Sequence, residues 1–391
     1  MPERTPKNFS AEQWRSIFVE LNERGASYGL PAQRVDTLLL GSWNLRQFGD
    51  IQLDDRNRPR EPEAFRFMAS VLMHFDLVAI QEIKDDLDSL RLLHRFLPEY
   101  DLVVSDVTGN YERLGFFSKF ERVRRTNLAA EIDVPMVQMR SIIQDNWEEF
   151  QEELGRYGKE VTAGRKARIE FPAFLGFDRA PFCVSFEAGW RHAPLRFLAY
   201  NAHIYYGEKH EDRTNEFVAL LNWLFRRWGY AETIFSPNFI VFGDMNTEVV
   251  GRHRTTLETL REHILKQAKA SRRRALSRAR KEGDSQLVDA IKKQRVLFPF
   301  LTGLDDKPPP SVGSNLTGTE RFDQIFLLMR SSEADAPRIA EYGVFDIPLV
   351  VKSALKRYRL MDKTRTDRIR QQISDHVPIW IRLKLPDPLK V

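Results

Sequence analysis

Six short polar motifs, each closing or interrupting an apolar run, hold the residues of this chain that could do chemistry. They are Trp43-Asn44, Gln81-Glu82, Asn201-Ala202-His203, Gly243-Asp244-Met245-Asn246, Phe322-Asp323-Gln324 and Ser374-Asp375-His376. Each motif lies just after or inside a stretch that is predicted to be a buried β-strand. Distant strand ends can therefore bring amide, carboxylate and imidazole groups around one point. Such a gathering is what metal-assisted hydrolysis requires.

The elements that must position these motifs alternate between strand and helix. Strands are predicted over residues 37–43, 76–80, 100–105, 196–203, 238–242, 321–328 and 377–383. Helices are predicted over 9–24, over 62–74, and around Phe217–Phe225, where apolar residues recur with helical spacing. Ser10 and Gln13 resemble a capping box for the first helix, and Gly25 is its expected stop. The alternation predicts an α/β fold, and the continuous apolar runs predict strands buried on both faces.

Composition limits the class of protein. The 391 residues are 42% hydrophobic, which is ample for a core, and no apolar stretch reaches the roughly 20 residues that span a bilayer. The polar N-terminus shows no secretory signal. A single cysteine, Cys183, excludes a disulfide framework within the chain and is expected to be a buried thiol. An intracellular, cytoplasmic protein that does not enter a membrane is therefore expected.

The charge is basic overall and is gathered in two places. The net charge is +5 and the pI is about 9.2, which suits a polyanionic partner. One basic tract lies between Arg261 and Arg295, and a second leads from Lys352 to Arg370, directly before the last polar motif. Solvated helix faces are the ordinary explanation for such tracts, and contact with nucleic acid is the functional one.

The chain is predicted to form one domain with appendages. Residues 1–34 are expected to be an N-terminal helical extension, and residues 35–391 the main domain. Three segments, near 130–172, 252–296 and 331–371, are interpreted as insertions, because none has the apolar periodicity of a separate core.

Taken in order, the six motifs resemble those of the endonuclease/exonuclease/phosphatase superfamily, over about Val35 to Leu385. The details are closest to DNase I. Residues 43–49, Trp-Asn-Leu-Arg-Gln-Phe-Gly, resemble its first motif, and Asn110-Tyr111-Glu112-Arg113 resembles the segment that supplies a glutamate to a catalytic histidine. Arg179-Ala180-Pro181 resembles its R-x-P segment. The resemblance implies a two-sheet β-sandwich flanked by helices in four layers, here with helical insertions.

The resemblance also implies roles for individual residues. Glu82, Asn44 and Asp375 would hold Mg²⁺, with Mn²⁺ as an alternative, since hard cations take oxygen ligands. Two histidine–carboxylate pairs would move protons, and these are His376 with Asp323 and His203 with Glu112. Asp244 would orient the attacking water, and either Asp244 or His376 would be the general base. The expected substrate contacts are Asn246, Arg46, Arg179, Tyr111 and Asn201.

The expected function is that of a metal-dependent phosphodiesterase on nucleic acid, most closely a DNase I-like endonuclease leaving 5′-phosphate and 3′-hydroxyl ends. DNA is the expected partner. The same residues would serve a phosphatase or phosphodiesterase acting on inositol phosphates or phospholipids, because specificity lies in loops. A catalytically inactive scaffold that binds nucleic acid through its basic tracts is the alternative from another class.

Overall fold

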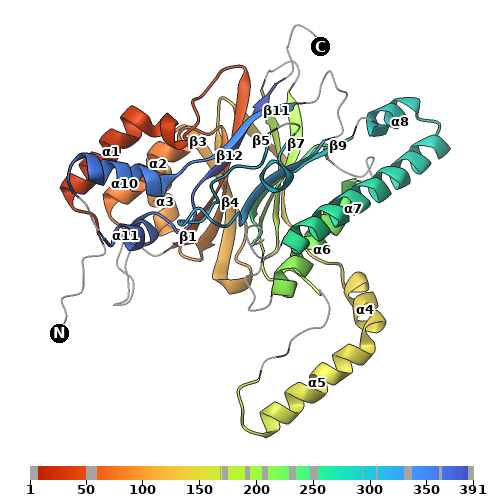
Figure 1. The fold of residues 1–391 in the computed structure, drawn as a ribbon. Helices are drawn as coiled ribbons and strands as arrows, with labels where there is room; N and C mark the ends of the chain where they lie inside the picture. The colour runs from red at the N-terminus through yellow and green to blue at the C-terminus, as the bar shows by residue number, and fades with distance from the viewer. Residues whose placement is uncertain are drawn as a thin grey trace.

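Two six-stranded sheets lie face to face in the centre of the molecule (Figure 1). The first has the order β11-β12-β1-β2-β4-β3, and its strands span Arg338–Val344, Ile379–Lys384, Thr37–Phe48, Leu77–Lys84, Glu112–Lys119 and Tyr100–Val104. The second has the order β5-β6-β7-β8-β10-β9, with strands Val123–Glu131, Phe182–Ala188, Leu195–His203, Phe239–Asp244, Asp323–Met329 and Arg295–Leu297. The computed structural model describes residues 8–49, 60–167, 169, 175–189, 194–204, 210–228, 235–246, 254–292, 294–304, 307–329, 337–360 and 363–385.

The two sheets share one pattern of strand direction. The central pair of each sheet is parallel, β1 with β2 in the first and β7 with β8 in the second, and every other pair is antiparallel. Parallel neighbours end at the same edge of a sheet. Four of the six polar motifs lie at the carboxyl ends of these central strands, so each sheet brings two motifs to one edge.

Helices cover both outer faces of the sandwich, giving four layers (Figure 1). The first sheet is covered by α1 (Ala11–Arg24), α2 (Pro62–Leu72), α3 (Asp88–Arg95), α10 (Ile347–Arg357) and α11 (Arg365–Gln372). The second is covered by α6 (His210–Trp228), against which α7 (Arg254–Lys281) packs. The remaining helices are α4 (Met136–Asp145), α5 (Trp147–Thr162), α8 (Ser285–Lys292), α9 (Pro299–Thr302) and two short 3-10 turns, Gly25–Tyr28 and Gly109–Tyr111. This is the flanked two-sheet sandwich expected from the sequence.

Three apolar clusters hold the layers together. One lies between the inner faces of the sheets, one between the first sheet and its helices, and one between the second sheet and α6. Cys183 is buried in the third cluster, and burial raises the pKa of its thiol to about 12, as expected for a structural cysteine. No helix in the described ranges combines the length and the apolar character needed to cross a bilayer.

The N-terminal helix packs more intimately than an extension would. The capping box of Ser10 and Gln13 forms as predicted, and the α-helix ends at Arg24. Gly25 is right-handed, and the chain runs on as a 3-10 turn until Gly29, whose φ of 88° provides the left-handed stop. Trp14 lies in the core beneath the first sheet's helices, so residues 11–24 belong to the helical layer of the domain.

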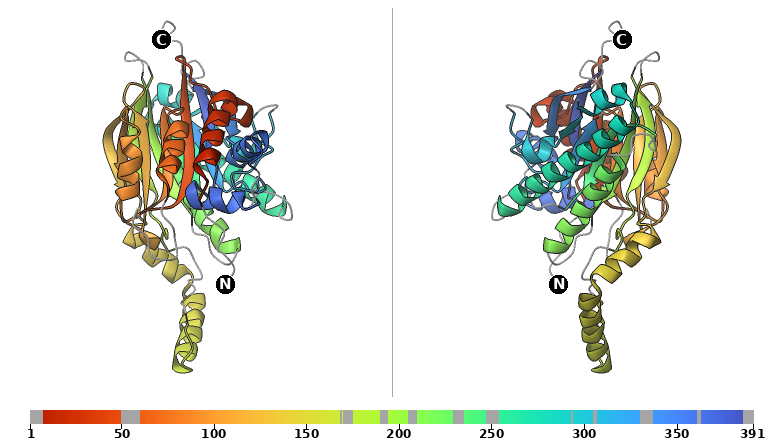
Figure 2. Two further views of the ribbon diagram at one scale, coloured as in Figure 1. Left: turned by 90° about the vertical axis from the view of Figure 1, so that its left-hand side faces the viewer. Right: turned by 90° about the vertical axis from the view of Figure 1, so that its right-hand side faces the viewer.

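The segment 331–371 differs from the predicted insertion. Residues 338–344 form β11, which pairs with β12, and α10 buries Val350, Val351 and Leu355 in the core. Its sequence is irregular because β11 is an edge strand with only partly buried side chains. The other two segments do add helices outside the sandwich, and α4 and α5 project from the body (Figure 2). Parts of the three segments, including 252–253, 331–336 and 361–362, lie outside the described residues.

Candidate active site

Three site residues stand side by side on adjacent strands of the second sheet. His203 is the register partner of Asp244 across the parallel pair β7–β8, and Asp244 is the register partner of Asp323 across the antiparallel pair β8–β10. Gly243 makes this close register possible, because a Cβ at this position would lie 1.8 Å from the carbonyl oxygen of Ala202. Register partners on neighbouring strands lie close together when their side chains point to the same face of the sheet. The sheet thus presents an imidazole and two carboxylates in a row.

Irregularities in the pairing of β1, β2 and β4 orient the side chains that the first sheet contributes to the site. The pairing of β1 with β2 shifts register after Asn44, and that of β2 with β4 shifts around Glu82. Arg46, Gln47 and Glu82 all have positive φ values, of 49°, 44° and 60°. Non-glycine residues in the left-handed region are uncommon, and such bulges re-aim side chains at functional sites.

The bulges bring Asn44 and Glu82 into direct contact. The Asn44 amide nitrogen donates to Glu82 Oε1 at 2.8 Å and to Asp244 Oδ2 of the other sheet at 3.1 Å. The backbone N–H of Gln47 donates to the second Glu82 oxygen at 2.8 Å. The hydrogen bonds from Asn44 and Gln47 therefore fix the Glu82 carboxylate, and the left-handed backbone at Glu82 directs its side chain toward them.

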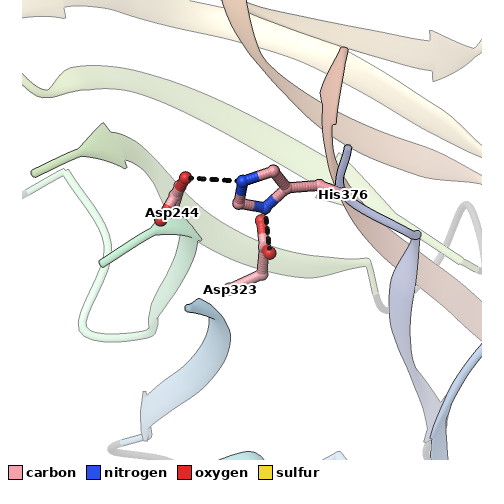
Figure 3. A group of neighbouring side chains, drawn as sticks. All are labelled: Asp244, Asp323 and His376. Atoms are coloured by element: carbon pink, nitrogen blue, oxygen red, sulfur yellow. Dashed lines mark hydrogen bonds and ion pairs between the residues drawn. The ribbon is translucent and has the colours of Figure 1, made fainter. Parts of the chain in front are cut away.

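His376 joins the two sheets through the first histidine–carboxylate pair (Figure 3). It precedes β12 of the first sheet, and its Nδ1 lies 2.7 Å from Oδ2 of Asp323 in the second sheet. Its other nitrogen, Nε2, lies 3.5 Å from Asp244 Oδ2. Burial lowers the pKa of His376, but the charges of Asp323 and Asp244 outweigh burial and hold that pKa well above its usual range.

His203 forms the second pair, also across the sheets. Its Nδ1 lies 3.0 Å from Glu112 Oε2 of β4, and its Nε2 lies 3.8 Å from the same Asp244 oxygen that His376 faces. Glu112 is also contacted by two cations, Lys84 at 2.9 Å and Arg179 at 2.7 Å. Burial raises the pKa of Glu112, but the hydrogen bond to His203 and the nearby positive charges prevail and lower it to about 2.

The oxygen-rich side of the site suits a hard divalent cation. Among the described residues, ligand atoms of Asp244, Asp323 and His376 lie within 4.8 Å of one another. Among the described residues, Glu82 accepts hydrogen bonds from the Asn44 amide and the Gln47 backbone, both uncharged, while Asp375 Oδ2 is 3.0 Å from Arg46 Nε. Carboxylate oxygens are the ligands that Mg²⁺ takes. The residues therefore fit a divalent ion.

Asn44 differs from its predicted role as a metal ligand. Its amide nitrogen faces Glu82 and Asp244, and its oxygen accepts the backbone N–H of Arg46 at 2.8 Å. In this arrangement Asn44 links two carboxylates and presents no free oxygen. Asp375 faces Arg46 at the rim, so a metal ion bound by Asp375 would share it with that arginine.

The predicted substrate contacts fall into two groups. Arg46 and Arg179 pair with the carboxylates of Asp375 and Glu112, and Tyr111, which precedes Glu112 in the chain, is 76% exposed. Asn246 is buried at the end of β8, where its backbone N–H donates to Asp244 Oδ1 at 3.0 Å and its amide to the Ile204 carbonyl.

Asn201 does not reach the substrate side. It is fully buried between the sheets, and both amide hydrogens go to main-chain carbonyls, of Ile80 and Gly115, each at 2.9 Å. Its oxygen accepts from the Gln81 side chain at 2.7 Å. The structure therefore gives Asn201 a place between the sheets, where a buried amide satisfies its hydrogen bonds inside the fold.

Two residues of the site were missed by sequence reasoning. Lys84, two residues after Glu82, pairs with Glu112 on the neighbouring strand. Arg60 donates to the carbonyls of Leu45 and Arg46 at 2.8 and 2.6 Å and so supports the bulge. Neither the pairing of two strands nor the hydrogen bonds of Arg60 to main-chain carbonyls elsewhere in the chain leave a local signal in the sequence.

Comparisons with known proteins give fold likeness only. No protein-family model matches the chain, and no curated protein matches its sequence. Solved structures do match. An endonuclease/exonuclease/phosphatase family protein from Bacteroides thetaiotaomicron is 13% identical, with 90% of this chain and 96% of that chain covered and a TM-score of 0.49. A mannosyl-6-phosphatase from the same organism is 14% identical, with coverages of 88% and 99% and a TM-score of 0.48. TDP2 of D. rerio, complexed with a single-strand DNA product, is 13% identical, with coverages of 89% and 98% and a TM-score of 0.45.

The first of the three structures is named as a member of the superfamily that the six motifs resemble. All three TM-scores lie below 0.5, so none of these likenesses supports an argument about this chain. The assignment of a function therefore depends on the geometry of the site.

Proposed function

We propose that this chain is a metal-dependent phosphodiesterase acting on nucleic acid, most closely a DNase I-like endonuclease. The observation that carries the proposal is the convergence of two histidine–carboxylate pairs on one oxygen of Asp244, at 3.5 Å from His376 and 3.8 Å from His203. Each pair takes its histidine from one sheet and its carboxylate from the other. A structural histidine needs no such arrangement, whereas proton transfer to and from a phosphodiester does.

The roles follow from the surroundings of each group. A divalent cation held by Glu82 and Asp375 would neutralise phosphate charge and polarise the phosphoryl oxygen when bound. Asp323 and Glu112 fix the orientation of their imidazoles, leaving Nε2 of both histidines toward Asp244. In this proposal Asp244 orients the attacking water between them, and a group that protonates the departing oxygen completes the reaction. Arg46, Arg179 and Tyr111 line the entrance for the phosphate and its flanking groups.

In the proposed reaction, water attacks phosphorus in line and the bond to the 3′ oxygen breaks. The products are then a 5′-phosphate and a 3′-hydroxyl. Either Asp244 or His376 accepts the proton of the water. The raised pKa of His376 favours the imidazolium form of this residue in the resting site, which makes His376 the better proton donor and Asp244 the better acceptor.

A side-by-side assay tests the proposal. The purified chain is incubated with supercoiled plasmid, inositol phosphates and sphingomyelin, each with Mg²⁺, with Mn²⁺, and with EDTA. We expect nicking of the plasmid that EDTA stops and Mg²⁺ restores. Hydrolysis of only a small or lipid phosphate would replace the nuclease proposal with a phosphatase, and retention of DNA without cleavage of any substrate would indicate an inactive scaffold.

A further inference from the structure

The C-terminal half of α7 concentrates positive charge without internal compensation. Residues 266–281 contain no acidic residue and eight basic ones, which are Lys266, Lys269, Arg272, Arg273, Arg274, Arg278, Arg280 and Lys281. All eight are exposed. One ion pair of this segment joins Arg278 to Glu282. We call this segment the α7 basic face.

The basic face and the packed face of α7 are opposite each other. Ala275 and Ala279 are buried against Ile291 of α8 in a small apolar cluster. Arg272 also donates to the Lys292 carbonyl at the end of α8, and the other seven basic residues are exposed around the rest of the helix. Several basic residues lie three or four positions apart, as in Lys269–Arg273 and Arg274–Arg278. Like charges at this spacing each cost a few tenths of a kcal/mol. A polyanion bound along the helix would remove that repulsion.

The second basic tract shows what a structural use of arginines looks like. Arg357 of α10 pairs with Glu20 and Glu23 of α1, at 3.2 and 2.7 Å. Arg368 donates to the Asn8 carbonyl and to the Gln13 side chain. These arginines attach α10 and α11 to the N-terminal helix. The α7 basic face makes few such contacts, so its charge is available to a partner.

We infer that the α7 basic face binds the phosphate backbone of a long nucleic acid at a distance from the catalytic site; this inference rests on the proposed function. The face extends over roughly 22 Å of helix, at 1.5 Å per residue, and Ala275 and Ala279 pack there on α8 instead of on a strand that carries a site residue. A dinucleotide in the active site would not also cover this length of helix, whereas a polymer can. The contact therefore tethers long substrates and leaves short ones unaffected.

An anionic membrane is the less suitable partner. A helix that binds a membrane surface places an apolar face in the lipid beside its basic one. The apolar side of α7 in this region is instead packed on α8, which lies at the outer edge of the molecule (Figure 1). Binding to nucleic acid needs only phosphate contacts, because sequence-independent affinity comes from lysine and arginine.

The test compares two triple variants of the full chain. R273Q/R274Q/R280Q removes three charges from the basic face, and K352Q/K356Q/K363Q removes three exposed lysines from the other tract as a matched control. Binding to a fluorescent DNA duplex of about 30 base pairs is followed by anisotropy in EDTA over a range of salt. Glutamine keeps helix propensity close to that of arginine, so both proteins should fold.

We expect the salt slope of log K to fall by about 2.7 in R273Q/R274Q/R280Q, at 0.9 per lost phosphate contact, and to change little in the control. R273K/R274K/R280K should restore it. On cleavage, the first variant should raise KM for plasmid and leave kcat/KM for a short oligonucleotide unchanged. Equal losses in both triple variants, an unchanged slope, or loss of binding to phosphatidylserine vesicles without loss of DNA binding would overturn the inference. If DNA binds through this face and no phosphodiester is cleaved, the proposed function fails and the inference stands.

Discussion

The two histidine–carboxylate pairs have the same geometry and opposite electrostatic surroundings. Asp323 is buried beside Asp244, and its second oxygen, Oδ1, has no hydrogen-bond partner among the described residues. Glu112 is buried between Lys84 and Arg179, and the Asn110 side chain also donates to it at 2.8 Å. The first pair carries excess negative charge, while the second is compensated.

This difference in charge indicates different roles for the two pairs. The surroundings of His376 shift its pKa, whereas those of Glu112 fix the position of its carboxylate. The negative charges of Asp323 and Asp244 raise the pKa of His376, so this imidazole keeps its proton. The cations around Glu112 keep it ionised and fix its position, so the second pair orients His203. Stability and chemistry should therefore respond differently when each carboxylate is removed.

Removal of either imidazole should have the largest effect. We expect His376→Ala and His203→Ala each to lower kcat by about 10³-fold, since positioned acid–base groups contribute about 10²–10⁴-fold. Plasmid nicking under saturating Mg²⁺ measures this, and circular dichroism checks the fold. His94→Ala is the control, because His94 lies outside the site, where it bonds to the Tyr100 carbonyl and packs against the Phe117 ring. Near-full turnover in either site variant would contradict the assigned role of that histidine.

Neutralising the carboxylates should separate activity from stability. Asp323→Asn and Glu112→Gln should each lower kcat by roughly 10²-fold, because the imidazole loses the partner that orients it. The free energy of unfolding should stay level or rise for Asp323→Asn, since one of the two buried carboxylates that share the His376 imidazolium is removed. For Glu112→Gln it should fall by roughly 3 kcal/mol, since Arg179 loses its partner. Urea unfolding measures both, and equal destabilisation would show that the surroundings of the two pairs do not differ in effect.

The pH dependence of stability gives a second view of Glu112. Its pKa in the folded chain is about 2, below the ordinary value of 4.5. The stabilisation from its ionised form is therefore complete above pH 4.5 and is lost as the pH falls toward 2. The stability difference between the natural chain and Glu112→Gln should shrink over that range. A constant difference would mean that the lowered pKa is not what stabilises this region.

Lys84→Gln should have the smallest effect. The Lys84 side chain is 27% exposed, and a partly exposed ion pair is worth up to about 1 kcal/mol, or roughly fivefold in kcat. Arg179 remains to hold Glu112 in this variant, and Lys84→Arg should restore activity. A loss as large as that of Glu112→Gln would place Lys84 in direct contact with the substrate.

The sequence was most informative where a strong local pattern met a chemical requirement. Apolar runs that end in Asn, Glu, Asp or His located β1, β2, β7, β8 and β10, and the superfamily resemblance gave their convergence. Contacts that depend on strand pairing were not predictable. Lys84 meets Glu112 only because β2 and β4 are neighbours, and Asn201 faces the sheet interface although two residues later His203 faces the site.

Edge strands and short helices were the least predictable parts of the fold. The strand β11 is stabilised by its pairing with β12, while its own residues are polar enough to look irregular in the sequence. The basic tracts show the same limit. Arg357 and Arg273 have similar sequence neighbourhoods, yet only the first finds glutamates on another helix.

The exchange of partners between the sheets has a consequence for synthesis of the chain. Each histidine–carboxylate pair combines one residue from each sheet, and His376 is the last of the four paired residues in chain order. On the proposed function, a nascent polypeptide would stay harmless to the RNA around the ribosome until its final strand has been translated and has joined the finished sandwich.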